Sequence, residues 1–187
     1  MKLVKTLVTV LLAVVFSVSL FAGYRAATPE QVARASMSAC ALARNIQELE
    51  SADIYVMGNP EIAIALKKYE GQKVGSVVVR SIKSGESLPK FKPNVLICGN
   101  NSYVEEVKKY CRRNNILSIG ASSNSCKKGL SMSLVQESNQ SDQNSLSPVK
   151  LLINQEASLY ESIQWYKAIS AVSFKVNSND DYAYLSY

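Results

Sequence analysis

The sequence contains no histidine. This absence excludes Ser/His/Asp and Cys/His nucleophile systems, imidazole general-base catalysis and most transition-metal sites, because each depends on an imidazole. Adjacent carboxylates do not take its place. Glu105 and Glu106 point in different directions on a predicted helix, and Asp180 and Asp181 lie in a predicted tail. We therefore expect a protein that is not an enzyme and that has neither a cofactor nor a metal site.

The sequence also lacks a concentrated block of charge. Its formal net charge is +6, but the basic residues come as scattered pairs at predicted element ends, such as Lys67-Lys68 and Lys127-Lys128. Such pairs are typical of solvated ends, not of the basic surface that nucleic acids bind. The glycine spacing of a dinucleotide loop and the GK[ST] phosphate loop are absent as well. We expect no nucleic-acid partner.

One long uncharged apolar run is present, at residues 7–22, after Lys2 and Lys5 and before Gly23. A charged start followed by an apolar run is the pattern of a secretory signal peptide. The alternative is a membrane anchor, which needs about 20 apolar residues. We predict that residues 1–22 are a signal peptide, cleaved near Ala22, and that the mature protein is exported to the periplasm.

Four cysteines follow the predicted signal peptide. An even number outside the cytosol indicates disulfides, and four cysteines allow three pairings. Cys98 ends a predicted strand and Cys126 lies in the loop after the next strand, so both should lie at the carboxyl edge of a parallel sheet, and we favour this pair. Cys111 lies on the buried stripe of a predicted helix and Cys40 in another helix, where a thiol is often a small core residue. Because no pair has CxxC spacing, we do not expect zinc.

Residues 93–121 contain the clearest signals for the fold. An uninterrupted apolar run at 95–97 predicts a strand covered on both faces. A glycine-asparagine turn at 99–101 ends this strand. Ser102 is the expected N-cap of an amphipathic helix, and residues 116–119 return as a second buried strand. Two parallel strands joined by a helix need further strands beside them to form a sheet.

The remaining elements alternate along the chain. Periodicity and turn residues predict helices at 28–50, 60–70 and 155–173, strands at 53–57, 74–82, 130–137 and 149–154, a loop at 122–129 and a loose tail at 177–187. This order predicts a single α/β domain, residues 23–176, built as a three-layer sheet with helices on both faces. Its strands are expected to be mostly parallel, with an antiparallel edge hairpin formed by the last two.

The two turns that follow strands are a candidate ligand site. Gly58-Asn59 and Gly99-Asn100-Asn101 each place backbone amides at the start of a helix, where an anion or a small polar ligand can bind. The same turns are needed simply to reverse the chain, so a purely structural role is the alternative. A small-ligand-binding module of a periplasmic transport or sensing system is accordingly the second function that we consider.

Six stretches carry a family resemblance: DIYVMGNPEIAIAL, GQKVGSVVVRSI, KPNVLICGN, ILSIGA, KKGLSMSLVQE and VKLLINQEAS, followed by a long closing helix. Together they are similar to the YfiR/HmsC family of exported regulators. The resemblance implies a periplasmic protein that associates as a homodimer and restrains a membrane-bound diguanylate cyclase through the periplasmic domain of the cyclase. It thereby implies control of cyclic-di-GMP and of adhesion or biofilm formation. Some members of the family are tuned by disulfides, and this chain has cysteines suited to that role.

Overall fold

The computed structural model describes residues 27–136 and 149–175. The predicted signal peptide (1–22) and the predicted tail (177–187) lie outside the described residues. Within them, the helices are α2 (Pro29–Leu42), α3 (Arg44–Gln47), α4 (Pro60–Leu66), α5 (Val104–Asn114), α6 (Asn124–Lys127) and α7 (Gln155–Tyr160), with 3-10 turns η1 (Lys67–Tyr69), η2 (Asn101–Tyr103) and η3 (Lys167–Ala171). The strands are β1 (Ser51–Met57), β2 (Lys73–Val74), β3 (Val77–Gly85), β4 (Val95–Cys98), β5 (Leu117–Gly120), β6 (Met132–Gln136), β7 (Val149–Ile153) and β8 (Ser173–Lys175).

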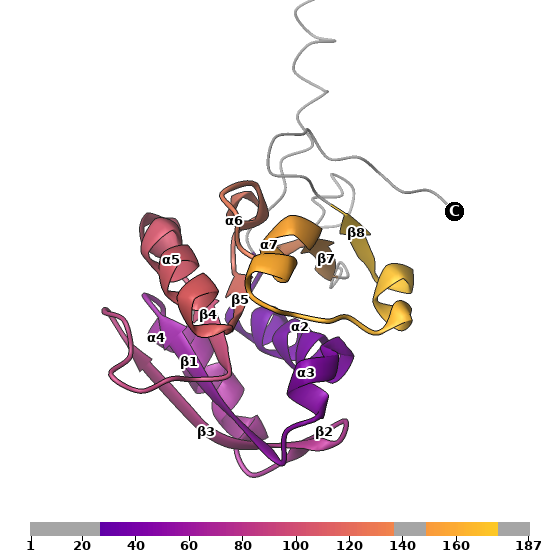
Figure 1. Cartoon of the computed structure of the whole chain (residues 1–187). Coiled ribbons are helices and arrows are strands. Elements are labelled where there is room, and N and C mark those ends of the chain that lie inside the picture. Colours follow the sequence, from indigo (N-terminus) through magenta and orange to yellow (C-terminus); the bar gives the residue numbers. More distant parts are fainter. Residues whose placement is uncertain (1–26, 137–148, 176–187) are drawn as a thin grey trace, which may run out of the picture.

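These strands form one sheet in the order β2-β3-β1-β4-β5-β6-β7-β8. The neighbours from β3 to β6 pair in parallel, as do β7 and β8, whereas β2 with β3 and β6 with β7 are antiparallel. The mostly parallel α/β sheet is therefore confirmed. The predicted hairpin of the last two strands is also antiparallel, with β8 added outside it at the edge of the sheet (Figure 1).

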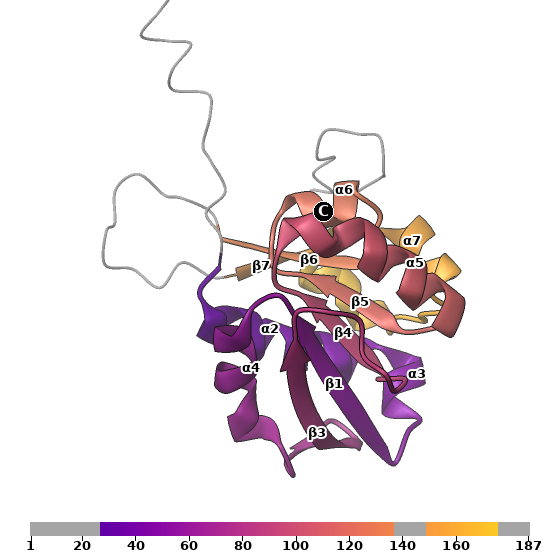
Figure 2. The ribbon, with the colours of Figure 1, turned by 90° about the vertical axis from the view of Figure 1, so that its left-hand side faces the viewer.

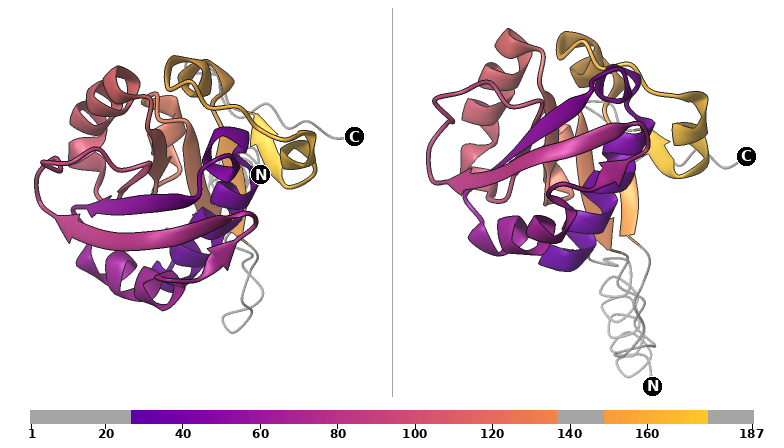
Figure 3. Two further views of the ribbon diagram at one scale, coloured as in Figure 1. Left: turned by 60° about the horizontal axis from the view of Figure 1, so that its bottom comes forward. Right: turned by 90° about the horizontal axis from the view of Figure 1, so that it is seen from below.

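Helices cover both faces of the sheet, which gives the three predicted layers. Figure 3 shows α2 and α4 on one side of β1 and β3, and α5 on the other side. Side chains alternate along the central strands in the same way: Ile54 and Val56 belong to the core under α2 and α4, whereas Tyr55 and Met57 belong to the core under α5. Each central strand is thus buried on both faces, as its uninterrupted apolar run predicts.

The chain reverses its direction of winding next to β1. From β1 it crosses through α4 to β3 on one side, and it then returns to β4 on the other side of β1 before crossing through α5 to β5 (Figure 2). In open α/β sheets, ligands bind outside the carboxyl ends of the strands at such a switch point. Here the switch point lies between β1 and β4.

The start of α2 agrees with the sequence prediction. Thr28 Oγ1 accepts the Gln31 N–H at 3.3 Å while Gln31 Oε1 accepts the Thr28 N–H at 2.9 Å, so a reciprocal cap opens α2. The cap before α5 differs from the prediction. Asn100, not Ser102, supplies the acceptor, because its Oδ1 binds the Ser102 N–H at 3.0 Å and starts the turn η2. Asn115 closes α5 in the left-handed region, at φ 53°.

Three predicted elements are divided differently. The helix predicted at 28–50 is interrupted at Ala43, which is extended and forms an antiparallel bridge with Trp165. The strand predicted at 74–82 is a hairpin, because Gly75 at φ 65° reverses the chain between β2 and β3. The loop predicted at 122–129 contains the single helical turn α6.

The prediction of one long helix at 155–173 is wrong. Only α7 is helical, and Ser162 at φ 58° ends it, with the Ile163 N–H bonded to the Ser158 carbonyl at 2.8 Å. The apolar residues that suggested a longer helix are buried all the same: Ile163 and Ile169 reach the core from an extended segment and from η3. Glu161, the residue that follows α7, is buried through contacts described below.

Candidate functional site

The turns after β1, β4 and β5 meet at one edge of the sheet. Met57 is in register with Cys98, and Cys98 with Gly120, so the three strands end side by side at the switch point. Around these ends lies a hollow of about 400 Å³, and the start of α2 forms part of its wall. The hollow is thus built from four segments that are distant in the sequence.

Glycine allows the first two turns to approach each other. A Cβ atom on Gly99 would lie 2.3 Å from the Cβ of Asn59, and a Cβ on Gly58 would lie 2.6 Å from the ring of Tyr103. Gly58 also has a φ of 76°, which favours glycine. Backbone hydrogen bonds fix the approach, since the Gly99 N–H donates to the Met57 carbonyl at 2.8 Å.

Asparagine side chains line the hollow and cap the helices beside it. Asn59 Oδ1 accepts the N–H groups of Glu61 (3.1 Å) and Ile62 (3.3 Å) at the start of α4. Asn100 Oδ1 accepts both the N–H and the hydroxyl of Ser102. Within the described residues, neither Asn59 Nδ2 nor Asn100 Nδ2 has an acceptor. Each asparagine therefore presents an amide donor whose orientation is set by the cap.

The third turn adds a hydroxyl. Asn101 Nδ2 donates to Ser122 Oγ at 2.9 Å, and the Asn124 N–H donates to the same oxygen at 3.4 Å. Glu61 is the only ionisable side chain of the described residues that line the hollow. Its carboxylate argues against the anionic ligand that the sequence left open, because no lysine or arginine accompanies it.

The sequence prediction located most of this site. Asn59, Gly99, Asn100 and Asn101 line the hollow, whereas Gly58 does not line it and lies against the ring of Tyr103. It missed Glu61 and Ser122. The shared register of the three strand ends would have placed the turn after β5 beside the other two, but that register depends on the complete sheet order.

The four cysteines are free thiols in this structure, and all are buried. Cys98 Sγ donates to the Asn100 carbonyl and Cys126 Sγ to the Leu152 carbonyl, each at 3.1 Å, so the predicted bond between these two residues is not formed here. Burial raises the pKa of Cys98 to about 11 and the pKa of Cys40 and Cys126 to about 12; burial also raises the pKa of Cys111. Because the thiolate is the reactive form, these thiols are poorly reactive while buried.

Within 27–136 and 149–175, no group of candidate metal ligands occurs.

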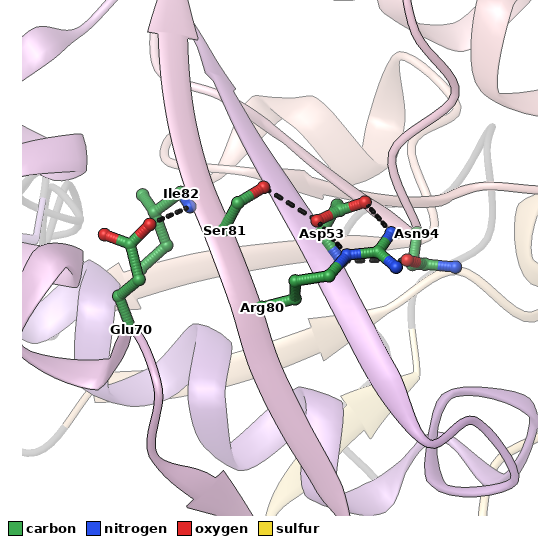
Figure 4. Close-up of polar contacts among 6 residues, drawn as sticks. All are labelled: Asp53, Glu70, Arg80, Ser81, Ile82 and Asn94. Atoms are coloured by element: carbon green, nitrogen blue, oxygen red, sulfur yellow. Dashed lines mark hydrogen bonds and ion pairs between the residues drawn. The ribbon is translucent and has the colours of Figure 1, made fainter.

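A second polar cluster lies away from the hollow, on the first half of β1 (Figure 4). The nearly buried Asp53 carboxylate accepts the Arg80 Nε–H at 3.0 Å, a second Arg80 bond from Nη2, and the Ser81 hydroxyl at 2.7 Å. Hydrogen bonding to Arg80 lowers the pKa of Asp53. Asn94 joins the cluster by accepting the Asp53 N–H through Oδ1 at 2.8 Å. These contacts tie β3 to β1 at a register shift and to the chain entering β4, so we assign them a structural role.

A third cluster fastens the C-terminal segment to the sheet. The Glu161 carboxylate is fully buried and accepts the Ser118 N–H at 2.9 Å, the Ser118 hydroxyl at 2.5 Å and the Ser131 hydroxyl at 2.6 Å. Burial raises the pKa of Glu161 to about 7, although the serine hydrogen bonds act in the opposite direction. The end of α7 is thus held against β5 and the start of β6 by one side chain.

The segment 159–172, on both sides of Glu161, exposes apolar side chains. Among the described residues, six large hydrophobic residues are exposed, and four of them belong to this segment: Leu159, Tyr160, Tyr166 and Val172. Arginines partly cover the two tyrosines, because Arg112 lies 4.6 Å from the ring of Tyr160 and Arg44 lies 5.4 Å from that of Tyr166. We call these four residues the C-terminal apolar surface.

Comparison with known proteins gives information on the fold only. No family model matches the chain, and no curated protein matches it. It is similar to a solved structure described as a conserved domain protein from Vibrio cholerae O1 biovar El Tor strain N16961, with 14% sequence identity and a TM-score of 0.54. The match covers 77% of this chain and 59% of that one, so this chain spans less than two thirds of its structural neighbour. In the part of the chain that the structure describes, no helix has the length and apolar character of a membrane span.

Proposed function

We propose that this protein is an exported regulator that acts by contact. It binds the periplasmic domain of an inner-membrane signalling protein, a diguanylate cyclase, and holds that domain in its inactive arrangement. The predicted signal peptide, the absence of histidine and the sequence resemblance to the YfiR/HmsC family support this proposal. The structural observation that supports it most is the C-terminal apolar surface, in the segment that leads to β8, the last strand of the sheet among the described residues.

The four exposed apolar residues all belong to one short segment, residues 159–172. Single exposed apolar residues are ordinary on soluble proteins, whereas several together indicate an interaction site. Leu159 exposes 77% of its surface and Val172 exposes 51%, with Tyr160 and Tyr166 between them in the sequence. Covering apolar surface stabilises a complex by roughly 25 cal/mol per Å² before the entropic cost of association. Within residues 27–136 and 149–175, β8 is an edge strand of the sheet, and an edge strand offers a partner backbone hydrogen bonds as well.

The regulator would restrain its partner by occupancy. A bound protein shifts an equilibrium only when it binds one state more tightly than the other. The rigid attachment of α7 through Glu161 suits this role, because a surface held in one position discriminates better between two arrangements of a partner. A homodimer, which the family resemblance implies, would present two such surfaces at once.

Deleting the gene in the native host tests the proposal. Cyclic-di-GMP, measured by mass spectrometry of cell extracts, should rise when the regulator is removed and return when the gene is restored. An unchanged level in cells that contain the partner cyclase contradicts the proposal.

A small-ligand-binding role is the second candidate function. The hollow at the switch point favours it, because it combines polar turns with an apolar wall where α/β sheets usually bind ligands. A ligand of the folded state raises its stability by RT ln(1 + [L]/Kd). Thermal unfolding against a panel of periplasmic metabolites therefore tests this role directly, since at least one metabolite should raise the Tm.

A further inference from the structure

We propose that the hollow between β1 and β4 binds a small neutral polyol, of monosaccharide size. This inference rests on the second candidate function, small-ligand binding, and names the chemical class of the ligand. The volume of about 400 Å³ lies near the lower end of the range of roughly 300–1,000 Å³ typical of small-molecule sites. Its position at the switch point follows the general rule for open α/β sheets.

The donors of the hollow are fixed by their second role as caps. Asn59 and Asn100 each use Oδ1 to accept backbone N–H groups. This assignment is unambiguous, because an amide nitrogen cannot accept from an N–H. The Nδ2 groups are therefore left as donors, and both side chains line the hollow. Their rotamers are held without any ligand, which lowers the entropic cost of binding.

Ser122 supplies a third donor. Its oxygen accepts from Asn101 Nδ2 and from the Asn124 N–H, so its own proton is directed elsewhere. Among the described lining residues, the Glu61 carboxylate is the one ionised acceptor. Three donors and one carboxylate match a ligand whose groups both donate and accept, which is the property of a hydroxyl.

Charged ligands fit this set of groups less well. A phosphate or carboxylate would meet Glu61 without a lysine or arginine in the described lining to balance its charge. An ammonium ion would satisfy Glu61 but could not accept from Asn59, Asn100 or Ser122, because an ammonium has no acceptor. Ile62, Pro29 and Ala121 form an apolar wall suited to the C–H face of a sugar or polyol.

The test is calorimetric titration of the protein purified from cells that express the whole sequence. The probes are a panel of neutral hexoses, pentoses, inositol and glycerol, with inorganic phosphate as the anionic probe and putrescine as the cationic one. At least one neutral probe should bind saturably, and phosphate and putrescine should not. Binding of only a charged probe overturns the proposed ligand class while leaving a small-ligand role intact, and no binding by any neutral probe also overturns the class.

Two variants locate the site. Asn59→Ser and Asn100→Ser keep an oxygen that can cap the following helix but remove the amide donor. Each should raise the Kd of the neutral probe at least about tenfold, the effect of one lost hydrogen bond to a ligand. Asn45→Ser is the matched control, because Asn45 Oδ1 also accepts a backbone N–H, from Gln164, away from the hollow. Equal affinity in all three variants places the ligand elsewhere and overturns the proposal. Cyclic-di-GMP levels, which test the regulatory function, do not enter this experiment.

Discussion

The part of the chain from β1 to β5 and the part from β6 to β8 belong to the same sheet, but different kinds of contact determine their structures. Between β1 and β5, local signals set each element: Asn59 caps α4, Asn100 starts η2 and Asn115 closes α5. Beyond β6, the main polar contact is tertiary: Glu161, the residue that follows α7, bonds to Ser118 on β5. The first part places polar turns around a hollow, and the second exposes an apolar surface. Hydrophobic periodicity therefore predicts the helices and strands in one part of a chain, and it fails in another part where a buried polar side chain makes contacts that are distant in sequence.

Removing the Glu161 carboxylate should have the largest effect on stability. Glu161→Ala leaves the Ser118 N–H and two serine hydroxyls buried without their acceptor, which should lower the free energy of unfolding by about 4 kcal/mol. Urea unfolding followed by the fluorescence of Trp165 measures this change. Glu161→Gln, which keeps one acceptor and the side-chain volume, should cost about half as much. Equal stability of Glu161→Ala and the wild type would show that the cluster does not hold the C-terminal part.

The buried contact of Glu161 should also make the free energy of unfolding depend on pH, in a direction that its pKa determines. The pKa of Glu161 is raised by burial from 4.5 to about 7 in the folded protein. The folded state therefore binds this proton more tightly than the unfolded state, and the contribution to stability is complete below pH 4.5 and lost as the pH rises to about 7. The effect is at most about 3 kcal/mol.

Comparison with Glu161→Gln isolates this titration from that of Asp53, whose lowered pKa acts in the opposite direction at acidic pH. Between pH 8 and pH 5, the wild type should gain stability relative to Glu161→Gln. A difference between the two proteins that stays constant over this range contradicts the assignment. Arg112, Cys111 and Cys126 also interact electrostatically with Glu161, and the raised pKa of both thiols keeps them protonated over this range.

Substitutions of glycine test the first part of the comparison. Gly99→Ala would bring a Cβ to 2.3 Å from the Asn59 Cβ and should cost about 2 kcal/mol, because the two turns cannot both keep their positions. Gly71→Ala is the matched control: it has no neighbouring atom within 4 Å and should cost about 1 kcal/mol through its φ of 78° alone. Thermal unfolding measures both. If Gly71→Ala proves the more destabilising, the close meeting of the turns is not what glycine provides at residue 99.

The smallest change in stability is expected on the C-terminal apolar surface. Leu159 is 77% exposed, so Leu159→Lys should change the free energy of unfolding by less than about 0.5 kcal/mol. Urea unfolding checks this value. A loss of several times that size would mean that Leu159 supports the fold and is not available to a partner.

The sequence predicts the part from β1 to β5 better than the part that follows it. The strands β1, β4 and β5, the helix α5 and four of the residues at the hollow are predicted, because their signals are local: apolar runs, glycine turns and capping residues. Glu161 gives no such signal. It stands at a position that helical periodicity treats as ordinary, and only the serines on β5 and before β6, about 43 and 30 positions away in sequence, make it a buried anchor. Ser122 was missed at the hollow for a related reason, since its position depends on the register of β4 with β5.

The proposed regulatory function is tested most directly by complementation of the deletion strain with two matched variants. Leu159→Lys places a charge on the C-terminal apolar surface, and Ile64→Lys places one on α4, at a residue of similar exposure (72%) on a different element. With both variants expressed at equal levels, we predict that Ile64→Lys restores low cyclic-di-GMP and that Leu159→Lys leaves it raised. Restoration of the low level by both variants would contradict the account.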